Sequence, residues 1–588
     1  MTGKRKKKAV ELVIAPEAVI ATKCWWELPI LGALIFGALL LRIVGQLDKV
    51  FVNGNVWFRG VDSWYHMRLA DSTVVNFPSF PSWDMFAKYP AGTEVGYLPL
   101  LSWVVALLGK IGNYEVAAAF LPTVLGALTL IPIYLVGREV FSGKVGLLAC
   151  LLIAVLPGEF FHRTMLGFTD HHAFESLLMA TTLLFFLYAY RTLKWRWMTL
   201  SGVSLGLYHL AWAGTSFFLL IIGIWMWFEF LRRYKHNEPI HPLCLMVTVP
   251  VGIGLLISFP YLGKESLLIS SGLLGLSAVL WLLTRFVKDR EYVLFGLTLL
   301  APAGLVVLGF FQSWHSLIVT IFWGGSTYIQ EAAPLTPTVL FATYGISFFL
   351  MLGGLWFCPR EKSKGLFLIW CIVLIIAAVG QRRWGYYTAI PVSLLATYFA
   401  FYLTKWVSPR VRVAVVVVVA LFLLIPNVNN TVRLVWLPNA ITSNWYVALT
   451  WLEKYTPNPF ENENAYYDQG SREKASYGIL SWWDYGHWVI RISKRVPTDS
   501  PTLASGAPAR FFASKTVEEA ERHLKGLNIR YIVIDSTLLT GKWHAVPRRA
   551  GKEPFNVEES VLWQLWTEQL DQYKKVFERS DIKIFERG

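Results

Sequence analysis

Long apolar runs recur from residue 28 to residue 426 of the chain, and a loop that carries Lys or Arg follows every second run. Of the 588 residues, 55% are hydrophobic and only 16% are charged, which exceeds what the core of a soluble protein needs. One helical crossing of a bilayer takes about 20 apolar residues. We therefore expect a polytopic α-helical membrane protein, and counting crossings between the basic loops predicts about thirteen transmembrane helices.

The positive charges set the expected orientation. Cytoplasmic loops carry an excess of Lys and Arg, and the basic stretch Lys4–Lys8 within residues 1–27 fits a cytoplasmic N-terminus. An odd number of crossings then places the C-terminus outside. The formal charge of +15 is gathered in short loops, which argues against a nucleic-acid partner. The loops expected inside are Gly137–Lys144, Arg191–Trp197, Leu231–Glu238, Arg285–Glu291, Pro359–Gly365 and Lys405–Arg412.

Two long loops are expected outside the membrane, residues 45–116 and 312–336. Within the first, Leu98–Leu108 is apolar enough to be a span. A crossing there would invert the charge pattern from Gly137 onward. We therefore expect this segment to form a helix that lies against the membrane or against the protein.

Residues 427–588 differ in character from the rest, because Asn, Pro, Glu and Lys become frequent and no apolar run long enough to span a bilayer remains. The patterns of Asn439–Tyr455 and Glu518–Lys525 predict helices, and Arg530–Asp535 predicts a buried strand. A segment of roughly 160 residues is large enough to have its own core. We expect a soluble, extracytoplasmic domain of mixed α/β structure.

The polar tail contains an improbable pentapeptide, Trp482-Trp483-Asp484-Tyr485-Gly486. Two adjacent indoles and a carboxylate in a hydrophilic segment need an explanation other than core packing. A carboxylate can accept a hydrogen bond from a hydroxyl group, and indoles pack well against a methyl group. The pentapeptide therefore predicts a pocket for a small group that bears a hydroxyl or a methyl.

The loops expected outside carry a second set of polar residues, which includes Asp62, Asp170-His171-His172 and Glu331. Carboxylate oxygens with a neutral imidazole suit Mg²⁺ or Mn²⁺. A divalent ion beside a lipid phosphate would neutralise the charge of a leaving group. A single acidic residue in a loop is more often exposed to solvent than bound to a metal ion. The Asp-His-His run beside a span is harder to dismiss, because ionisable groups at membrane depth usually face a cavity or a partner.

Arg383 lies in Gln381–Tyr387, another loop expected outside, where the positive-inside bias disfavours it. A guanidinium there could hold a lipid-linked phosphate through two hydrogen bonds. The alternative is a side chain that snorkels to the membrane interface. Trp212 lies in another loop expected at the outer membrane face. A single tryptophan in such a position is more often an interfacial anchor than part of a binding site.

Together these residues resemble the catalytic subunits of oligosaccharyltransferase, which include archaeal AglB and bacterial PglB. Trp482–Gly486 is the strongest match, and the chain resembles a short archaeal AglB. Glu331 matches the glutamate of the family's outside-loop motif, although Tyr328-Ile329-Gln330 before it departs from the pattern. The resemblance implies a glycosyltransferase fold of the GT-C type. It also implies transfer of an oligosaccharide from a dolichyl monophosphate or pyrophosphate carrier to the Asn of Asn-x-Ser/Thr, with inversion at the sugar carbon.

The resemblance also implies a role for each residue. Asp62 and Glu331 would be catalytic and would bond the acceptor amide, and Mg²⁺ or Mn²⁺ would be held by Asp62, Asp170 and His172. The lipid phosphate would be bound by His171, Arg383 and Trp212. The acceptor peptide would be bound by Trp482, Trp483, Asp484, Tyr485, Gly486 and, more weakly marked because no properly spaced Asp-x-x-Lys is present, Lys542.

Two other functions remain open from the sequence. A protein O-mannosyltransferase would share the outside acids and the basic lipid site, but would not need Trp482–Gly486. A transporter or flippase would need charged or broken helices at the midplane, whereas these acids lie in loops. We expect a multi-pass protein of the cell membrane that binds membrane lipid and acts as a single subunit, because one chain carries a near-complete set of motifs.

Overall fold

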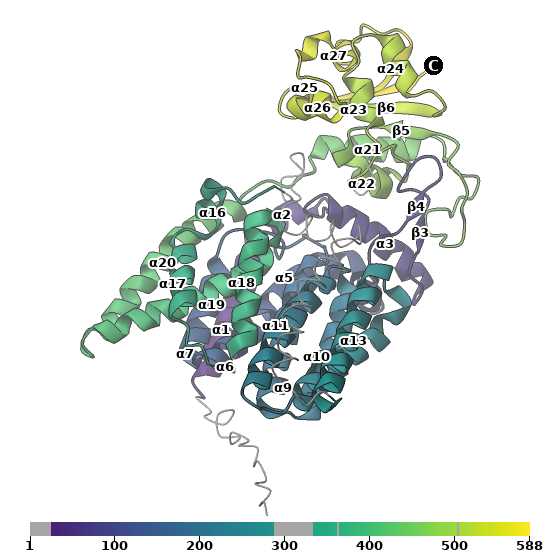
Figure 1. Ribbon diagram of the computed structural model, residues 1–588. Coiled ribbons are helices and arrows are strands. Elements are labelled where there is room, and N and C mark those ends of the chain that lie inside the picture. The colour runs from purple at the N-terminus through teal and green to yellow at the C-terminus, as the bar shows by residue number, and fades with distance from the viewer. Residues whose placement is uncertain (1–24, 287–332, 362–363, 502–504) are drawn as a thin grey trace, which may run out of the picture.

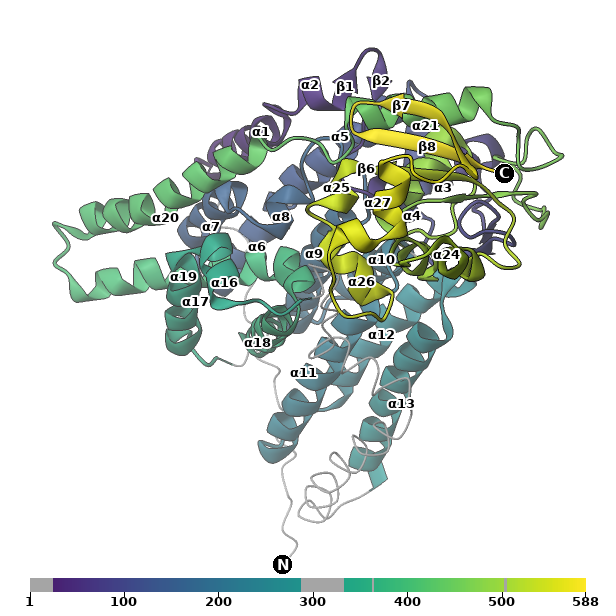
Figure 2. The same cartoon turned by 90° about the horizontal axis from the view of Figure 1, so that it is seen from above.

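The computed structural model describes residues 25–286, 333–361, 364–501 and 505–588. A bundle of helices forms one part of the molecule, and a smaller tail of helices and strands lies at one end of it (Figure 1). Seen from above, the tail covers α3 (Asp62–Asn76), α4 (Leu100–Gly109) and the start of α9 (His172–Thr192) and leaves α20 (Arg412–Val435) uncovered (Figure 2).

The bundle consists of apolar helices. Among the described residues, seven are long and apolar enough to cross a membrane, or eight if the bent pair α16 and α17 forms one span. The chain is therefore a multi-pass membrane protein, and the count of thirteen remains a prediction. The helices of the bundle are α1 (Glu27–Ile43), α5 (Tyr114–Leu128), α6 (Leu130–Val140), α7 (Gly143–Val155), α8 (Glu159–His162), α9 (His172–Thr192), α10 (Trp195–Ala211), α11 (Thr215–Lys235), α12 (His241–Ser258), α13 (Lys264–Phe286), α16 (Pro337–Tyr344), α17 (Ile346–Phe357), α18 (Gly365–Gly380), α19 (Gly385–Leu403) and α20 (Arg412–Val435).

Small residues let the helices approach closely. A Cβ atom on Gly202 of α10 would lie 2.6 Å from the Cβ of Ile253, and one on Gly206 would lie 2.7 Å from the Cβ of Ile257, both on the α12 side. Such small-residue contacts are the usual means by which helices pack in membranes, where the hydrophobic effect does not drive helices together.

The first external segment contains short elements: α2 (Leu47–Val50), β1 (Phe51–Val52), β2 (Asn55–Val56), α3 (Asp62–Asn76), β3 (Trp83–Asp84), β4 (Thr93–Glu94) and α4 (Leu100–Gly109). Helix α4 has 10 residues and is therefore about 15 Å long, half of what a span needs. It packs against α3 and α5. This agrees with the prediction that Leu98–Leu108 lies against the protein and does not cross.

The tail is a mixed α/β domain, as predicted. Its sheet has the order β5-β6-β8-β7, in which β5 and β6 are parallel and the other pairs are antiparallel. The predicted buried strand is β6, and the two predicted helices are α21 and α24. The elements are α21 (Ser443–Tyr455), β5 (Gly478–Leu480), η7 (Trp483–Tyr485), α22 (Gly486–Trp488), η8 (Val489–Ser493), α23 (Ala507–Phe512), α24 (Val517–His523), β6 (Ile529–Asp535), α25 (Ser536–Leu539), η9 (Trp543–Ala545), α26 (Val546–Arg549), η10 (Val557–Glu559), α27 (Val561–Trp566), β7 (Tyr573–Arg579) and β8 (Ile582–Arg587).

Helix α20 runs past residue 426, where the membrane part was expected to end, and continues to Val435. Polar side chains in this extension find partners inside the protein. Asn427 Nδ2 donates to the carbonyl of Leu423 at 2.6 Å, and Thr431 Oγ1 donates to the carbonyl of Val155 at 2.8 Å. The polar composition after residue 426 therefore reflects helix packing in its first residues and not yet a soluble domain.

The tail is fastened to the first external segment by a buried ion pair. Arg491 of η8 donates to both carboxylate oxygens of Asp71 on α3, at 3.1 and 3.2 Å. Tyr114 and Tyr466 donate to the same carboxylate at 3.0 and 2.9 Å. The tail and residues 45–116 therefore lie on the same side of the bundle, as the predicted orientation requires.

Candidate functional site

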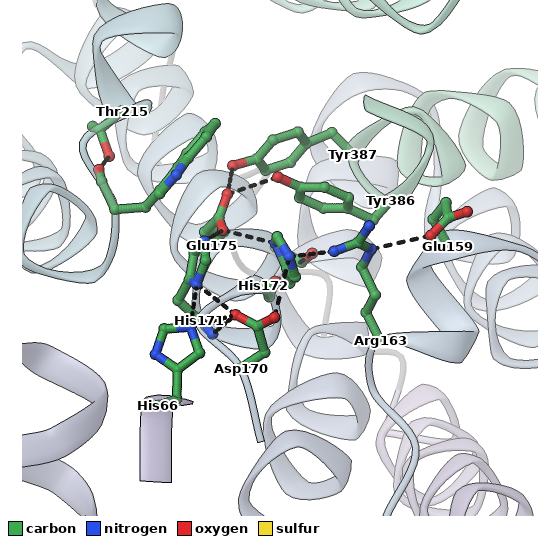
Figure 3. Close-up of polar contacts among 12 residues, drawn as sticks. His66, Glu159, Arg163, Asp170, His171, His172, Glu175, Thr215, Tyr386 and Tyr387 are labelled. Carbon is green, nitrogen blue, oxygen red and sulfur yellow. Dashed lines mark hydrogen bonds and ion pairs between the residues drawn. The ribbon is translucent and has the colours of Figure 1, made fainter. Parts of the chain in front are cut away.

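Asp170, the first residue of the Asp-His-His run, lies in a buried cluster just before α9 (Figure 3). Its Oδ1 lies 2.9 Å from Nε2 of His66 and 2.5 Å from Nδ1 of His171. Its Oδ2 lies 3.5 Å from Nε2 of His172. The structure therefore brings Asp170, His171 and His172 together, and adds His66.

His66 is a residue that the sequence reasoning did not assign. It lies one turn after Asp62 on α3, and residues four apart share one face of a helix. An acid and a histidine four positions apart are the sequence pattern that could have pointed to His66. His66 also lies 3.0 Å from His171, ring nitrogen to ring nitrogen, which places α3 directly against the start of α9.

Glu175 is a second residue that the sequence reasoning missed. It lies in the first turn of α9 and is fully buried. Its carboxylate contacts both His171 and His172, at 3.1 and 3.0 Å. A carboxylate inside an otherwise apolar helix was the available signal, since ionisable groups within membrane helices are usually functional.

The ligand atoms of the cluster suit a divalent cation. Among the described residues, His66, Asp170 and His171 form one group whose ligand atoms lie within 4.8 Å of one another, and His171, His172 and Glu175 form another. Carboxylate and imidazole donors at this spacing fit a divalent metal ion. The predicted set of Asp62, Asp170 and His172 is brought together only in part, because neither group includes Asp62.

Asp62 begins α3 at the edge of this cluster. Loss of surrounding water raises the pKa of its carboxyl, but the hydrogen bond and charge of His487 lower it, and the resulting pKa lies below the ordinary value. The charge of Asp170 acts in the opposite direction and raises the pKa. Asp62 therefore stays ionised at neutral pH.

Arginines lie on the other side of the histidines. Arg163 contacts the imidazole of His172 through Nη1 and pairs with Glu159 at 3.1 Å. Arg382 pairs with the same Glu159 at 3.0 Å. Arg383, the predicted phosphate ligand, is the middle residue of the one-turn helix η5 (Arg382–Trp384) and is half-buried.

Trp212, the other residue predicted to bind the lipid phosphate, lies between His171 and the η5 turn. Its ring lies 6.2 Å from that of His171 in a stacked arrangement and 6.0 Å from that of Trp384. Tryptophan, histidine and the arginine-bearing η5 thus border one region next to the cluster. The structure brings Trp212 against His171 and against Trp384, the residue that follows Arg383.

The pentapeptide forms part of a hydrogen-bonded polar cluster in the tail. Lys542 lies 3.0 Å from Oδ2 of Asp484 and 3.1 Å from the hydroxyl of Tyr485. That hydroxyl also donates to Asp535, whose two oxygens both lie at 2.9 Å. Asp535 was not assigned from the sequence, because it precedes Lys542 by seven positions, a spacing that matches no expected motif.

The last residue of the pentapeptide must be glycine for a steric reason. A Cβ atom on Gly486 would meet the carbonyl oxygen of Asp499 and would lie 2.6 Å from the Cα of Ser500. Both are backbone atoms, which cannot rotate away as a side chain can. Because glycine has no side chain, the backbone at Gly486 can pass close to the backbone of Asp499 and Ser500.

The pentapeptide lies next to the start of α3, which borders the Asp170 cluster. His487, which follows Gly486, is fully buried, and its Nδ1 lies 3.4 Å from Oδ1 of Asp62. Its ring stacks on Tyr65 of α3, with centroids 4.8 Å apart. Glu331, the other predicted catalytic residue, lies outside the described residues.

Two family models match the chain. The model of the N-terminal part of the oligosaccharyl transferase STT3 matches residues 34–323. The model of the AglB core domain matches residues 442–539. The matched ranges contain Asp62, the Asp170–His172 run and the pentapeptide.

A relative and two solved structures are similar over most of the chain. Dolichyl-phosphooligosaccharide-protein glycotransferase 3 of Archaeoglobus fulgidus is 28% identical over 89% of this chain and 71% of the relative. The structure of AglB from A. fulgidus in complex with an inhibitory peptide and a dolichol-phosphate has a TM-score of 0.81 and 26% identity, and covers 90% of this chain and 71% of that one. A structure of the A. fulgidus oligosaccharyltransferase in complex with Zn and sulfate has a TM-score of 0.76 and 27% identity, with 90% and 70% covered.

Proposed function

We propose that this chain, which belongs to the family of oligosaccharyltransferase catalytic subunits represented by STT3 and AglB, transfers an oligosaccharide from a lipid-linked phosphate donor to the Asn of an Asn-x-Ser/Thr sequon. One observation carries this proposal. His487, which follows Trp482–Gly486, contacts Asp62 beside the Asp170 cluster. The proposed acceptor site and a charged centre therefore lie side by side. A short peptide segment can therefore reach both.

The pocket suits the Ser or Thr of the sequon. Asp484 can accept a hydrogen bond from the hydroxyl, and Trp482 and Trp483 offer surfaces for the methyl of Thr. Lys542 holds the Asp484 carboxylate from one side. A site built to bond a hydroxyl strongly disfavours peptides that lack it.

Asp62 carries the chemical step on the acceptor side. A carboxamide nitrogen is a poor nucleophile, because its lone pair is conjugated with the carbonyl. An ionised carboxylate that accepts hydrogen bonds from the amide N–H groups weakens this conjugation and orients the nitrogen. We propose this role for Asp62, together with Glu331, and inversion at the sugar carbon as the outcome.

The donor side is formed by the histidines, the tryptophan and the arginine. A guanidinium such as that of Arg383 can hold a phosphate by two charge-assisted hydrogen bonds. His171 and Trp212 border the same region. We propose that they bind the phosphate of a dolichyl-type carrier, which is the class of lipid present in the A. fulgidus complex.

We propose that Asp62, Asp170 and His172 would hold a divalent ion. His172 and His66 lie 3.5 and 2.9 Å from the carboxylate of Asp170. When bound, the ion would neutralise the charge that develops on the leaving phosphate. We propose Mn²⁺ or Mg²⁺ and favour Mn²⁺, since imidazole donors bind it more strongly than they bind Mg²⁺. We also propose that the N-terminus is cytoplasmic, that the tail is extracytoplasmic, and that one chain is active alone.

One experiment tests the function. The purified chain is incubated with a membrane lipid extract and a labelled Asn-x-Thr peptide, with and without a divalent metal, and a Gln-x-Thr peptide serves as the control. We expect metal-dependent glycosylation of the Asn peptide alone. Equal transfer to the Gln-x-Thr peptide would instead indicate modification of the hydroxyl, as expected of a protein O-mannosyltransferase, and would overturn the proposal.

A further inference from the structure

Glu175 is a carboxylate with four polar side-chain partners. It lies in the first turn of α9, within a helix long and apolar enough to span a membrane, and its side chain is fully buried. Burying a carboxylate is costly unless it is paired and hydrogen-bonded. The carboxylate contacts four polar side chains, and these contacts offset the cost of its burial: His171, His172, Tyr386 and Tyr387.

The contact with His172 determines which ring nitrogen carries the proton. Nδ1 of His172 lies 3.0 Å from Oε1 of Glu175. An ionised carboxylate only accepts hydrogen bonds, and a neutral imidazole has one N–H and one lone pair. The proton therefore sits on Nδ1, and the lone pair sits on Nε2, which contacts Nη1 of Arg163 and lies 3.5 Å from Oδ2 of Asp170.

The ring of His171 is held between two carboxylates. Its Nε2 lies 3.1 Å from Oε1 of Glu175, and its Nδ1 lies 2.5 Å from Oδ1 of Asp170. Positions 171 and 172 precede 175 by four and three residues, so one turn of helix presents both rings to the same carboxylate. Glu175 therefore turns one nitrogen of each ring toward Asp170 (Figure 3).

The second oxygen of Glu175 is held by tyrosines. Oε2 accepts a hydrogen bond from Tyr386 at 2.8 Å and another from Tyr387. Tyr387 in turn accepts from the hydroxyl of Tyr208 at 2.8 Å. Both tyrosines lie at the start of α19, directly after the η5 turn that contains Arg383. Helix α19, which follows the proposed phosphate-binding arginine, thus holds the second carboxylate oxygen of Glu175 in place.

We propose that Glu175 is a positioning residue that sets the tautomer and orientation of His172 toward a divalent cation bound at Asp170 and fixes the ring of His171 beside that site, and that Tyr386 and Tyr387 hold Glu175 in place. This inference rests on the proposed metal-dependent function. Histidines that bind metals usually donate their other N–H to a carboxylate or carbonyl, and loss of that partner weakens metal affinity by about 10- to 100-fold.

The test measures Mn²⁺ binding to the purified, metal-free, full-length chain, followed by the electron paramagnetic resonance signal of free Mn²⁺. Glu175→Gln keeps the shape of the side chain and removes its charge. We expect it to bind Mn²⁺ about 10- to 100-fold more weakly than the unaltered chain. The matched control is Glu139→Gln, which removes a carboxylate that pairs with Arg191 at 2.7 Å, away from the cluster, and should leave Mn²⁺ affinity unchanged.

Thermal melting of the metal-free protein separates positioning from folding. Unchanged melting together with weaker Mn²⁺ binding supports the proposal, and wild-type affinity in Glu175→Gln overturns it. If Glu175→Gln also lowers the melting temperature, the double variant Tyr386→Phe and Tyr387→Phe decides, since it keeps the charge but frees Oε2. Weaker Mn²⁺ binding in that variant supports the proposal, and unaltered binding overturns it. Absence of Mn²⁺ binding by the unaltered chain would instead defeat the metal-dependent function itself.

Discussion

Nδ1 of His487 lies 3.4 Å from Oδ1 of Asp62, across the junction between the tail and the first external segment. His487 follows directly on Gly486, the last residue of the acceptor pocket, and Asp62 begins α3. The pocket that would hold the Ser or Thr and the carboxylate that would hold the Asn are therefore coupled through one side chain. A change in the position of the pocket must move either His487 or Asp62.

His487→Phe should slow transfer without unfolding the protein. Phenylalanine can keep the stacking on Tyr65 but cannot contact the Asp62 carboxylate. We expect kcat for an Asn-x-Thr peptide to fall on the order of 10²-fold, because a small displacement of a reacting group has an effect of that size. The measurement is steady-state transfer alongside thermal melting. His523→Phe on α24 is the control and should retain full activity, and retention of kcat in His487→Phe would refute the coupling.

Local features of the site could be predicted from the sequence, and contacts between distant segments could not. The pentapeptide and the Asp-His-His run are continuous in sequence, so residue types alone pointed to them. Glu175 could not be assigned in this way, because its partner Tyr386 is 211 positions away, and only the packing of α19 beside α9 brings them together. The same holds for His66, whose contact with Asp170 depends on how α3 meets the bundle.

Lys542→Ala should weaken acceptor binding. The ammonium pairs with Asp484 and contacts Tyr485, so its loss lets the carboxylate move within the pocket. Both side chains are partly exposed, which limits the effect, and we expect KM for the peptide to rise about three- to tenfold with kcat little changed. Lys552→Ala is a matched control, because Lys552 pairs with Glu519 at a similar exposure elsewhere in the tail. An equal rise of KM in both variants would contradict a specific role for Lys542.

Gly486→Ala should disrupt the pocket sterically. The added methyl would press against the backbone of Asp499 and Ser500, and overpacking of this kind costs about 1–3 kcal/mol. We expect a lower melting temperature and weaker binding of an Asn-x-Thr peptide. Gly470→Ala, where a Cβ would make only an ordinary contact at 3.6 Å, should change neither quantity. Normal peptide affinity in Gly486→Ala would show that the backbone can yield.

Removal of metal should stop transfer reversibly. Carboxylate and imidazole groups crowd together around Asp170, and without a cation no group there neutralises the leaving phosphate as strongly. We expect activity to disappear in EDTA and to return on dialysis into Mn²⁺ at a lower concentration than is needed with Mg²⁺, given the imidazole donors. Full activity in EDTA would exclude a metal requirement, and a stronger response to Mg²⁺ would exclude the histidines as principal ligands.

Arg491→Leu should detach the tail from α3. Its guanidinium is nearly buried and donates to both oxygens of Asp71, and breaking a buried pair by removing one partner destabilises a protein by about 3–5 kcal/mol, since the other charge is left uncompensated. We expect loss of transfer together with increased protease cleavage between the bundle and the tail. Lys494→Ala breaks the exposed pair with Glu453, two side chains that are 41% and 34% exposed, and should have an effect below about 1 kcal/mol. If Arg491→Leu kept both activity and protease resistance, the contact between Asp62 and His487 would not depend on this anchor, and the tail would be held by its apolar contacts alone.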